Sequence, residues 1–254
     1  MARLDYEHVG RRYDKGRGHS LAAIEPWRVA LADYLPPPDG LPILDVGSGT
    51  GQFATAFVHW FDATVIGVEP AAAMRHEARR KIAAPNIIFV GGRAEELPLR
   101  DATCGCAWLS TVIHHITDLR RCASELRRVL RGDARVLIRS AFPGHHDGIT
   151  LFRFFAAARR VAETFPSIEH VERSFASGGF EREALKSVSQ TTAPDLRACI
   201  ARVKLMRDAD STLAPISDEE FAQGLAAMEK SARDPATSGP VVDWLNLLVL
   251  RRRP

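Results

Sequence analysis

The chain has 254 residues, of which 46% are hydrophobic and 26% are charged, and its formal net charge is +3. These values predict a globular protein with one large α/β domain, or a core domain with a smaller addition. So small a net charge argues against a protein that binds nucleic acid through a strongly basic surface. The four cysteines lack metal-ligand spacing, which argues against a zinc site and a disulfide framework.

The N-terminal segment is charged and lacks the apolar stretch of a secretory signal. No apolar run has the length of a membrane span. We therefore expect a cytoplasmic protein without a membrane or nucleic-acid partner, and the Ala- and Arg-rich composition suggests a bacterial source. The sequence leaves the oligomeric state open between monomer and homodimer.

Residues 1–36 are expected to form a polar arm followed by a helix, because apolar residues recur at helical spacing from Leu21 to Leu35 before three prolines. Residues 37–142 then alternate short apolar strands with helices. Strands are predicted at 43–46, 64–69, 87–90, 106–109 and 135–138, and helices at 52–61, 71–83 and 119–130. This alternation predicts a parallel sheet with helices on both faces.

The pattern changes after Pro143. Residues 150–166 and 194–232 are expected to be helical, with further strands at 180–190 and 241–250. Residues 143–254 would then form a helical lid inserted near the last strands. The fold class predicted is α/β, with a Rossmann-like, mostly parallel, seven-stranded sheet.

A run of three glycines directly follows the first predicted strand, in ILDVGSGTG at 43–51. A ligand at the carboxyl end of that strand would lie where the strand order of such a sheet reverses. Gly47, Gly49 and Gly51 allow a tight turn and close contact between ligand and main chain. Glu69 ends the second strand, where a carboxylate can bind both hydroxyls of a ribose. Turn and carboxylate together predict a cofactor that contains adenosine.

The identity of the cofactor depends on the residues around the turn. The spacing is GxGxG rather than the GxGxxG of dinucleotide sites, and no Walker lysine follows. Asp45 would repel a pyrophosphate but would suit a ligand that carries an ammonium group. S-adenosylmethionine (SAM) has that group and a sulfonium. The alternative is a glycine turn that serves packing and binds no ligand.

Five segments resemble, in order, the successive motifs of class I SAM-dependent methyltransferases, above all the small-molecule branch of methyltransferase type 11-like and UbiE-like enzymes. They are ILDVGSGTG, VIGVEPAAAM, GRAEELPLRDA, STVIHHITD and ELRRVLRGDARVLI, and the resemblance covers residues 9–142. It implies SAM as cofactor, S-adenosylhomocysteine as product and methyl transfer to a small-molecule acceptor.

The resemblance also implies roles for individual residues. Asp45 and the three glycines would line the methionine portion of SAM, and Glu69 would bind the ribose. The further positions are Pro70 and Met74 beside the adenine, Ala94 and Glu95 at its edge, Ser110 and Thr111 on the sulfonium side, and Tyr13 and Arg17 over the methionine carboxylate. Two positions depart from the family pattern, which usually has Asp at positions 93 and 105 where this chain has Arg93 and Gly105.

A base is expected where an oxygen or nitrogen acceptor loses a proton, and histidine suits that task near neutral pH. His114 and His115 follow the fourth strand. Adjacent residues of an extended segment point to opposite sides, so at most one is expected to act as a base. Resemblance to methyltransferases of the phosphoethanolamine type implies His115, together with Tyr13. The alternatives are His114 as the base and a pair with a purely structural role.

The leading functional prediction is methyl transfer from SAM to an oxygen or nitrogen of a small molecule, such as a specialised metabolite, with carbon as a further possible acceptor. A nucleic-acid methyltransferase is an alternative, although the chain lacks the Asn/Asp-Pro-Pro-aromatic and Pro-Cys motifs of such enzymes. The departures at Arg93 and Gly105 leave room for a protein that binds SAM without transferring methyl. His145-His146-Asp147 is not expected to bind a metal, because neighbouring residues seldom converge on one ion.

Overall fold

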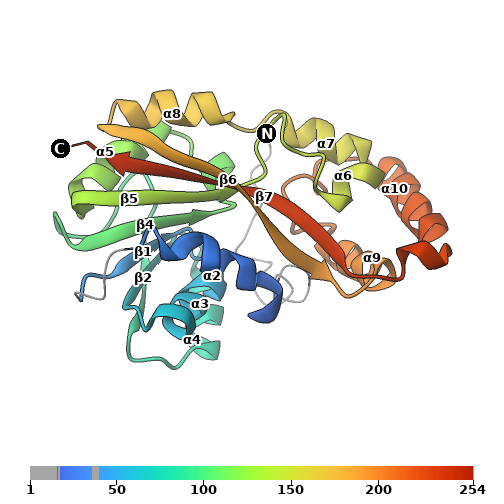
Figure 1. The fold of residues 1–254 in the computed structure, drawn as a ribbon, viewed down its shortest axis with the longest axis horizontal. Coiled ribbons are helices and arrows are strands. Elements are labelled where there is room, and N and C mark those ends of the chain that lie inside the picture. Colours follow the sequence, from blue (N-terminus) through green and yellow to red (C-terminus); the bar gives the residue numbers. More distant parts are fainter. Residues whose placement is uncertain (1–15, 17, 36–39, 254) are drawn as a thin grey trace.

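The computed structural model describes residues 16, 18–35 and 40–253. At its centre lies a seven-stranded sheet with the order β3-β2-β1-β4-β5-β7-β6 (Figure 1). The strands are β1 (Ile43–Val46), β2 (Val65–Glu69), β3 (Ile87–Gly91), β4 (Cys104–Ser110), β5 (Leu130–Ser140), β6 (Phe180–Ala193) and β7 (Val241–Arg252). β1 to β5 pair in parallel, and β7 pairs antiparallel with both β5 and β6. The predicted α/β fold with a mostly parallel seven-stranded sheet is confirmed.

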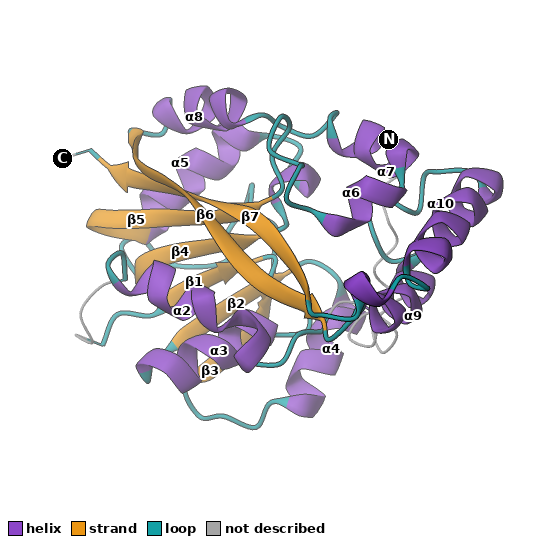
Figure 2. Cartoon of the chain, turned by 45° about the vertical axis from the view of Figure 1, so that its right-hand side comes forward, coloured by secondary structure: helices purple, strands orange, loops and turns teal. Residues whose placement is uncertain are grey.

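Helices cover both faces of this sheet (Figure 2). The described helices are α2 (Glu25–Ala32), α3 (Gln52–Phe61), α4 (Ala72–Lys81), α5 (Leu119–Val129), α6 (Thr150–Phe154), α7 (Ala156–Ala162), α8 (Ile168–Ala176), α9 (Leu196–Met206) and α10 (Asp218–Ser231). Short 3₁₀ turns occur at Ala22–Ile24, Ile113–His115 and Pro235–Thr237. Helices α2 and α3 lie on one face, and α5 and α8 lie on the other.

Aromatic packing fixes the face that carries α2 and α3. Trp108 of β4 is fully buried, and its ring lies 5.9 Å from Trp27 of α2 and 4.8 Å from Phe53 of α3, measured between ring centroids. Phe57, one helical turn after Phe53, approaches the same indole edge-on at 5.7 Å. Each such side chain contributes roughly 1.5–3 kcal/mol through burial. The opposite face is covered mainly by aliphatic residues of α5 and α8.

The lid helices α6, α7, α9 and α10 have a hydrophobic core of their own. Its members include Phe155, Val203, Leu213 and Met228, which are separate from the two clusters that flank the sheet. Helices α9 and α10 come between β6 and β7 in the chain. The two long strands reach from the sheet to the lid (Figure 1). The lid therefore stands beyond the carboxyl ends of the parallel strands.

Two differences from the predicted elements have local causes. Helix α8 was not predicted, although Ser167 caps it by accepting from the backbone N–H of His170, and Ile168, Val171 and Phe175 recur at helical spacing on its buried side. β5 begins at Leu130 rather than Arg135, because Leu130 pairs with Cys104 across a register shift. The pairing partner, and not the apolar run alone, sets the length of this strand.

Candidate active site

The glycine turn lies at the point where the strand order of the sheet reverses. β1 has β2 on one side and β4 on the other. The chain runs outward from β1 through β2 to β3 and then returns to the other side of β1 to form β4. The turn from Gly47 to Gly51 follows β1. Ser110 is the last residue of the neighbouring strand β4, and Thr111 follows it. Ligands of such sheets bind in the crevice at this position.

Backbone and packing both require glycine in this turn. Gly47, Gly49 and Gly51 have φ angles of +69°, +54° and +83°, which L side chains rarely adopt. A Cβ added at Gly51 would lie 2.5 Å from the Cδ1 atom of Ile82 and 2.7 Å from the Cζ atom of Phe89. At Gly49 the nearest atom would be 3.8 Å away, so only the backbone angle demands glycine there.

Glu69 stabilises the glycine turn through hydrogen bonds. It ends β2, and its carboxylate accepts hydrogen bonds from the N–H of Gly49 at 3.0 Å and from the N–H of Ala71 at 2.9 Å. The side chain therefore joins the turn after β1 to the start of α4. Its predicted role toward a ribose would be added to this structural one.

Asp45 is a buried carboxylate next to the turn. It is 2% exposed, and burial, followed by the nearby charge of Glu69, raises the pKa of Asp45 to about 7. Its Oδ2 atom has no hydrogen-bond partner among the residues that the structure describes. A buried carboxylate oxygen without a donor is unfavourable, and an ammonium group in the adjoining space would supply one. The site thus fits the amino-acid portion of SAM.

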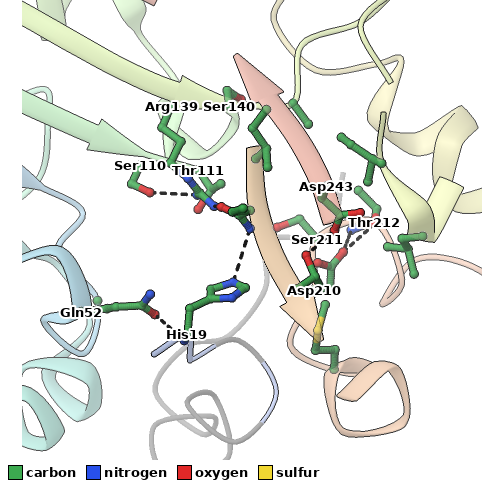
Figure 3. Close-up of a pocket in the computed structure, with 18 of the residues that line it drawn as sticks. His19, Gln52, Ser110, Thr111, Arg139, Ser140, Asp210, Ser211, Thr212 and Asp243 are labelled. Carbon is green, nitrogen blue, oxygen red and sulfur yellow. Dashed lines mark hydrogen bonds between the residues drawn. The ribbon is translucent and has the colours of Figure 1, made fainter. Parts of the chain in front are cut away.

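A cavity of about 220 Å³ extends from the glycine turn into the lid (Figure 3). Its wall at the sheet includes Asp45, Gly47, Ser48, Gly49, Thr50, Gln52, Ser110, Thr111 and Arg139. Its wall at the lid combines apolar and polar residues, among them Ile149, Leu151, Phe152, Phe165, Val203, Met206, Asp210, Ser211, Thr212 and Asp243. The cavity therefore joins the predicted cofactor turn to a chamber that could hold a second molecule.

The described part of the N-terminal arm borders this cavity. The N–H of His19 donates to the side-chain carbonyl of Gln52 at the start of α3, at 3.3 Å. From the lid, the Nη1 atom of Arg202 donates to the carbonyl of Gly18 at 2.8 Å. The arm is thus attached to both the core and the lid. Tyr13 and Arg17, which the sequence assigned to the cofactor, lie outside the described residues.

Arg139 is a cavity residue that sequence reasoning missed. It lies near the carboxyl end of β5, is 6% exposed, and donates to the hydroxyl of Ser110 at 3.1 Å and to the side-chain carbonyl of Gln190. Its guanidinium lies 5.1 Å from the ring centroid of Trp27 and 5.5 Å from that of Phe53. A signal was present in the sequence, because an arginine directly after the apolar run of a parallel strand is placed at the functional edge of the sheet.

The two histidines converge on one hydroxyl from the lid. The Oγ atom of Ser211 lies 3.1 Å from the Nε2 atom of His114 and 3.2 Å from the Nε2 atom of His115. The segment Ile113–His115 is a 3₁₀ turn rather than the extended strand that the sequence suggested, and this turn lets both rings reach one hydroxyl. The ring of His114 stacks on Phe165 at 4.2 Å and lines the cavity, whose lining does not include His115.

Several predicted site residues are not part of the cavity lining. These are Gly51, Glu69, Pro70, Met74, Ala94, Glu95 and His115. The carboxylate of Glu95 accepts from the N–H and the hydroxyl of Thr117, at 2.9 and 2.8 Å. It therefore already holds the segment after the histidines, and its role toward adenine stays a prediction.

The His145-His146-Asp147 segment forms ion pairs and hydrogen bonds with α7 and the residue that follows it. The Nδ1 atom of His146 lies 3.0 Å from a carboxylate oxygen of Glu163, and Asp147 accepts from Arg159 at 2.8 Å. Within the described ranges, no three His, Cys, Asp or Glu side chains are grouped as metal ligands. No described helix combines the length and apolar character needed to cross a bilayer.

Comparison with known proteins places the site in a family context. Residues 44–138 match the family described as methyltransferase domain. The chain is 29% identical to the demethylmenaquinone methyltransferase of Roseiflexus castenholzii, over 50% of this chain and 54% of that protein. It is 30% identical to the ubiquinone/menaquinone biosynthesis C-methyltransferase UbiE of Caulobacter vibrioides, over 54% of this chain and 59% of that protein. It thus spans a little over half the length of these relatives.

Solved structures share the fold, with TM-scores between 0.56 and 0.68. One is phosphoethanolamine N-methyltransferase 2 of Haemonchus contortus in complex with phosphomonomethylethanolamine and S-adenosylhomocysteine. It has a TM-score of 0.58 and 16% identity, and the match covers 99% of this chain and 61% of that one. At such identity the likeness concerns the fold. With the matched segment, the glycine turn and the sheet order together, residues 44–138 form a methyltransferase domain of the class I SAM-dependent type.

Proposed function

We propose that the protein transfers the methyl group of SAM to an oxygen or nitrogen of a small molecule. The observation that carries this proposal is a continuous cavity that begins at the glycine turn beside Asp45 and continues into the lid. A donor site and an acceptor site that open into each other allow two reactants to be held in line, which is the main requirement of methyl transfer from an activated donor.

The cofactor end would bind SAM mostly through backbone and carboxylates. Asp45 would face the ammonium group, the glycines would lie along the methionine portion, and Glu69 would reach the ribose. When bound, SAM supplies a methyl group on a positively charged sulfur. Ser110, the last residue of β4, and Thr111, which follows it, line the same cavity as His114.

The acceptor end combines apolar walls with a few polar groups. Phe152 and Phe165 contribute aromatic surface, and His114 contributes an imidazole. This combination favours an acceptor with an apolar or aromatic body and one ionisable hydroxyl or amine. Because His114 lines the cavity and His115 does not, we assign the role of base to His114, whereas the sequence favoured His115.

A carbon acceptor is the second candidate. The name of the Roseiflexus relative refers to demethylmenaquinone, and the UbiE name specifies a C-methyltransferase of ubiquinone and menaquinone biosynthesis. An aromatic ring with a hydroxyl that His114 can deprotonate would become nucleophilic at carbon as well as at oxygen. The same cavity serves both candidates, so the product distinguishes them.

Two measurements test the proposal. Calorimetry with SAM and S-adenosylhomocysteine should give binding, and Glu69→Gln should weaken it by roughly 10- to 100-fold, since one of the two N–H groups would then meet an amide N–H. Glu181→Gln, on the exposed part of β6, is the matched control.

Incubation of the protein with methyl-labelled SAM and a metabolite extract should give a labelled small molecule. The atom of that molecule that carries the labelled methyl group would identify an oxygen, nitrogen or carbon acceptor. Binding without any labelled product would favour a protein that binds SAM and does not transfer methyl. Failure to bind either compound would overturn the proposal.

A further inference from the structure

We propose that Gln190 is a positioning residue whose side-chain amide holds the N-terminal arm and Arg139 in place at the cavity wall. Gln190 lies on β6, is 5% exposed and lines the cavity. It lies outside the matched segment, residues 44–138. The inference rests on the proposed function for its purpose, because the cavity is taken as the SAM site, but its structural content can be tested without SAM.

The partners of Gln190 fix the direction of its amide. Its Oε1 atom accepts from the indole Nε1–H of Trp27, at 3.2 Å, and from the guanidinium of Arg139. An indole N–H and a guanidinium can only donate, so the atom that meets both must be the carbonyl oxygen. The NH₂ group of the amide is therefore turned the other way, toward the arm.

The amide nitrogen faces the imidazole of His19. The Nε2 atom of Gln190 lies 3.5 Å from the Nε2 atom of His19. An amide nitrogen donates and does not accept, so a hydrogen bond here requires an Nε2 atom without a hydrogen on His19. Gln190 thus favours the neutral ring with its hydrogen on Nδ1. A protonated ring would place one N–H group against another.

These contacts continue along the cavity wall on both sides of the amide. The backbone N–H of His19 donates to Gln52, the first residue of α3, which follows the glycine turn (Figure 3). On the other side of Gln190, Arg139 donates to the hydroxyl of Ser110 at 3.1 Å (Figure 3). Gln190 therefore connects the arm beside the cofactor turn with the residue that the sequence assigned to the sulfonium side.

The two halves of the amide have different tasks. Trp27 is fully buried, so its indole N–H needs an acceptor inside the protein, and the oxygen of Gln190 supplies it. The oxygen thereby joins α2 and β5 to β6, while the NH₂ group is directed at the arm. A carboxylate at position 190 would keep the first task and lose the second.

Charged side chains near His19 come from several elements. Arg202 of α9 donates to the carbonyl of Gly18, the preceding residue. The other ionisable residues that line the cavity with His19 are Asp45, His114, Arg139, Cys199, Asp210 and Asp243. The native protein and variants at position 190 share all these groups, so a difference in their pH dependence reports on the contact between His19 and position 190.

The test compares native protein and Gln190→Glu, both full-length and without ligand, by hydrogen exchange of residues 18–24 between about pH 8 and 5. Protection factors remove the intrinsic pH dependence of exchange. Native protection should fall by roughly 2- to 10-fold as His19 takes a proton. In Gln190→Glu, protection should be below the native value at high pH and should rise as pH falls, because a protonated ring can donate to the carboxylate.

Two further variants sharpen the comparison. The side-chain carbonyl of His19→Gln can accept from Gln190 at every pH, so this variant should keep the native protection of high pH and lose the pH dependence. Gln223→Glu adds the same charge at an exposed position of α10 and should behave like the native protein. If Gln190→Glu does not fold, the comparison of His19→Gln with the native protein decides the question.

A native pH dependence in Gln190→Glu, or one retained in His19→Gln, would overturn the inference. Absence of SAM binding or of methyl transfer would instead refute the proposed function and leave the exchange result standing.

Discussion

The two ends of the cavity use their carboxylates in opposite ways. At the core, Asp45 leaves its Oδ2 atom without a hydrogen-bond partner among the described residues, and its pKa is raised to about 7. At the lid, Asp243 accepts from the N–H of Thr150 at 2.8 Å and from the hydroxyl of Thr192. The core end thus leaves a carboxylate oxygen available for a ligand, while the lid end uses its carboxylate to hold three segments of the chain together.

The two ends also use glycine for different reasons. Gly51 is required by a φ angle of +83° and by the side chains of Ile82 and Phe89. Gly224, in the middle of α10, has helical backbone, but a Cβ there would lie 2.3 Å from the Cδ1 atom of Phe155. The cofactor end depends on backbone conformation, and the lid depends on the fit of side chains. Variants at these positions can separate the two.

The largest effect is expected for Gly51→Val. Left-handed backbone costs a non-glycine residue roughly 1–2 kcal/mol, and overpacking typically adds about 1–3 kcal/mol. Affinity for S-adenosylhomocysteine should fall by at least roughly 100-fold, because the turn can no longer contact the ligand. Thermal unfolding and calorimetry measure both effects. Gly239→Ala is the control, since an added Cβ there has no atom within 4 Å. Native affinity in Gly51→Val would contradict the role of the turn.

A smaller, pH-dependent effect is expected for Asp45→Asn. The folded-state pKa of Asp45 is raised from 3.8 to about 7, so its contribution to stability is fully present below pH 3.8 and is lost as pH rises through about 7. The native protein without cofactor should lose on the order of 4 kcal/mol from this group across that range. Asp45→Asn should flatten the profile and bind SAM more weakly.

Denaturant titrations at several pH values measure this difference. Asp243→Asn serves as the comparison from the lid, where loss of a satisfied carboxylate should destabilise the protein. If the stability of Asp45→Asn depended on pH more steeply than that of the native protein, the pH dependence could not be attributed to Asp45.

The smallest effect is expected for Gly224→Ala. The displaced Phe155 ring costs about 1–3 kcal/mol, and the better helix propensity of alanine returns about 1 kcal/mol. Hydrogen exchange should rise in α6, α7 and α10, with unchanged affinity for S-adenosylhomocysteine. Ala226→Gly, at an exposed position of α10, isolates the propensity term. If Gly224→Ala weakens cofactor binding as strongly as Gly51→Val, cofactor binding depends on the packing of the lid as well as on the glycine turn.

Local signals in the sequence were sufficient for much of the core. Helix α3 was predicted with its observed bounds, Gln52–Phe61, and the structure has a residue in left-handed conformation at each end, Gly51 and Asp62. Strand β1 was recognisable as the short apolar run before the glycine turn, and β2 as the apolar run that ends at Glu69. The fold class and the family of the matched segment, residues 44–138, followed from these features.

The lid gave weaker signals. Its helical character was predictable from composition, but the separation of 150–166 into α6 and α7, with Phe155 between them, was not. Arg139 and Gln190 were missed for a similar reason. Their hydrogen bond joins β5 to β6, and 51 residues separate them in the chain. A contact of that range has no periodic signature.

The sequence by itself determined the sheet, its glycine turn and the carboxylates beside the turn, because each depends on residues within one strand–turn–helix unit. Tertiary structure alone decided which histidine faces the cavity and which hydroxyl meets both rings. That choice depends on how a lid loop, held by Asp210 and Arg207, is placed against the edge of the core, and side chains so distant in the chain are brought together only by packing.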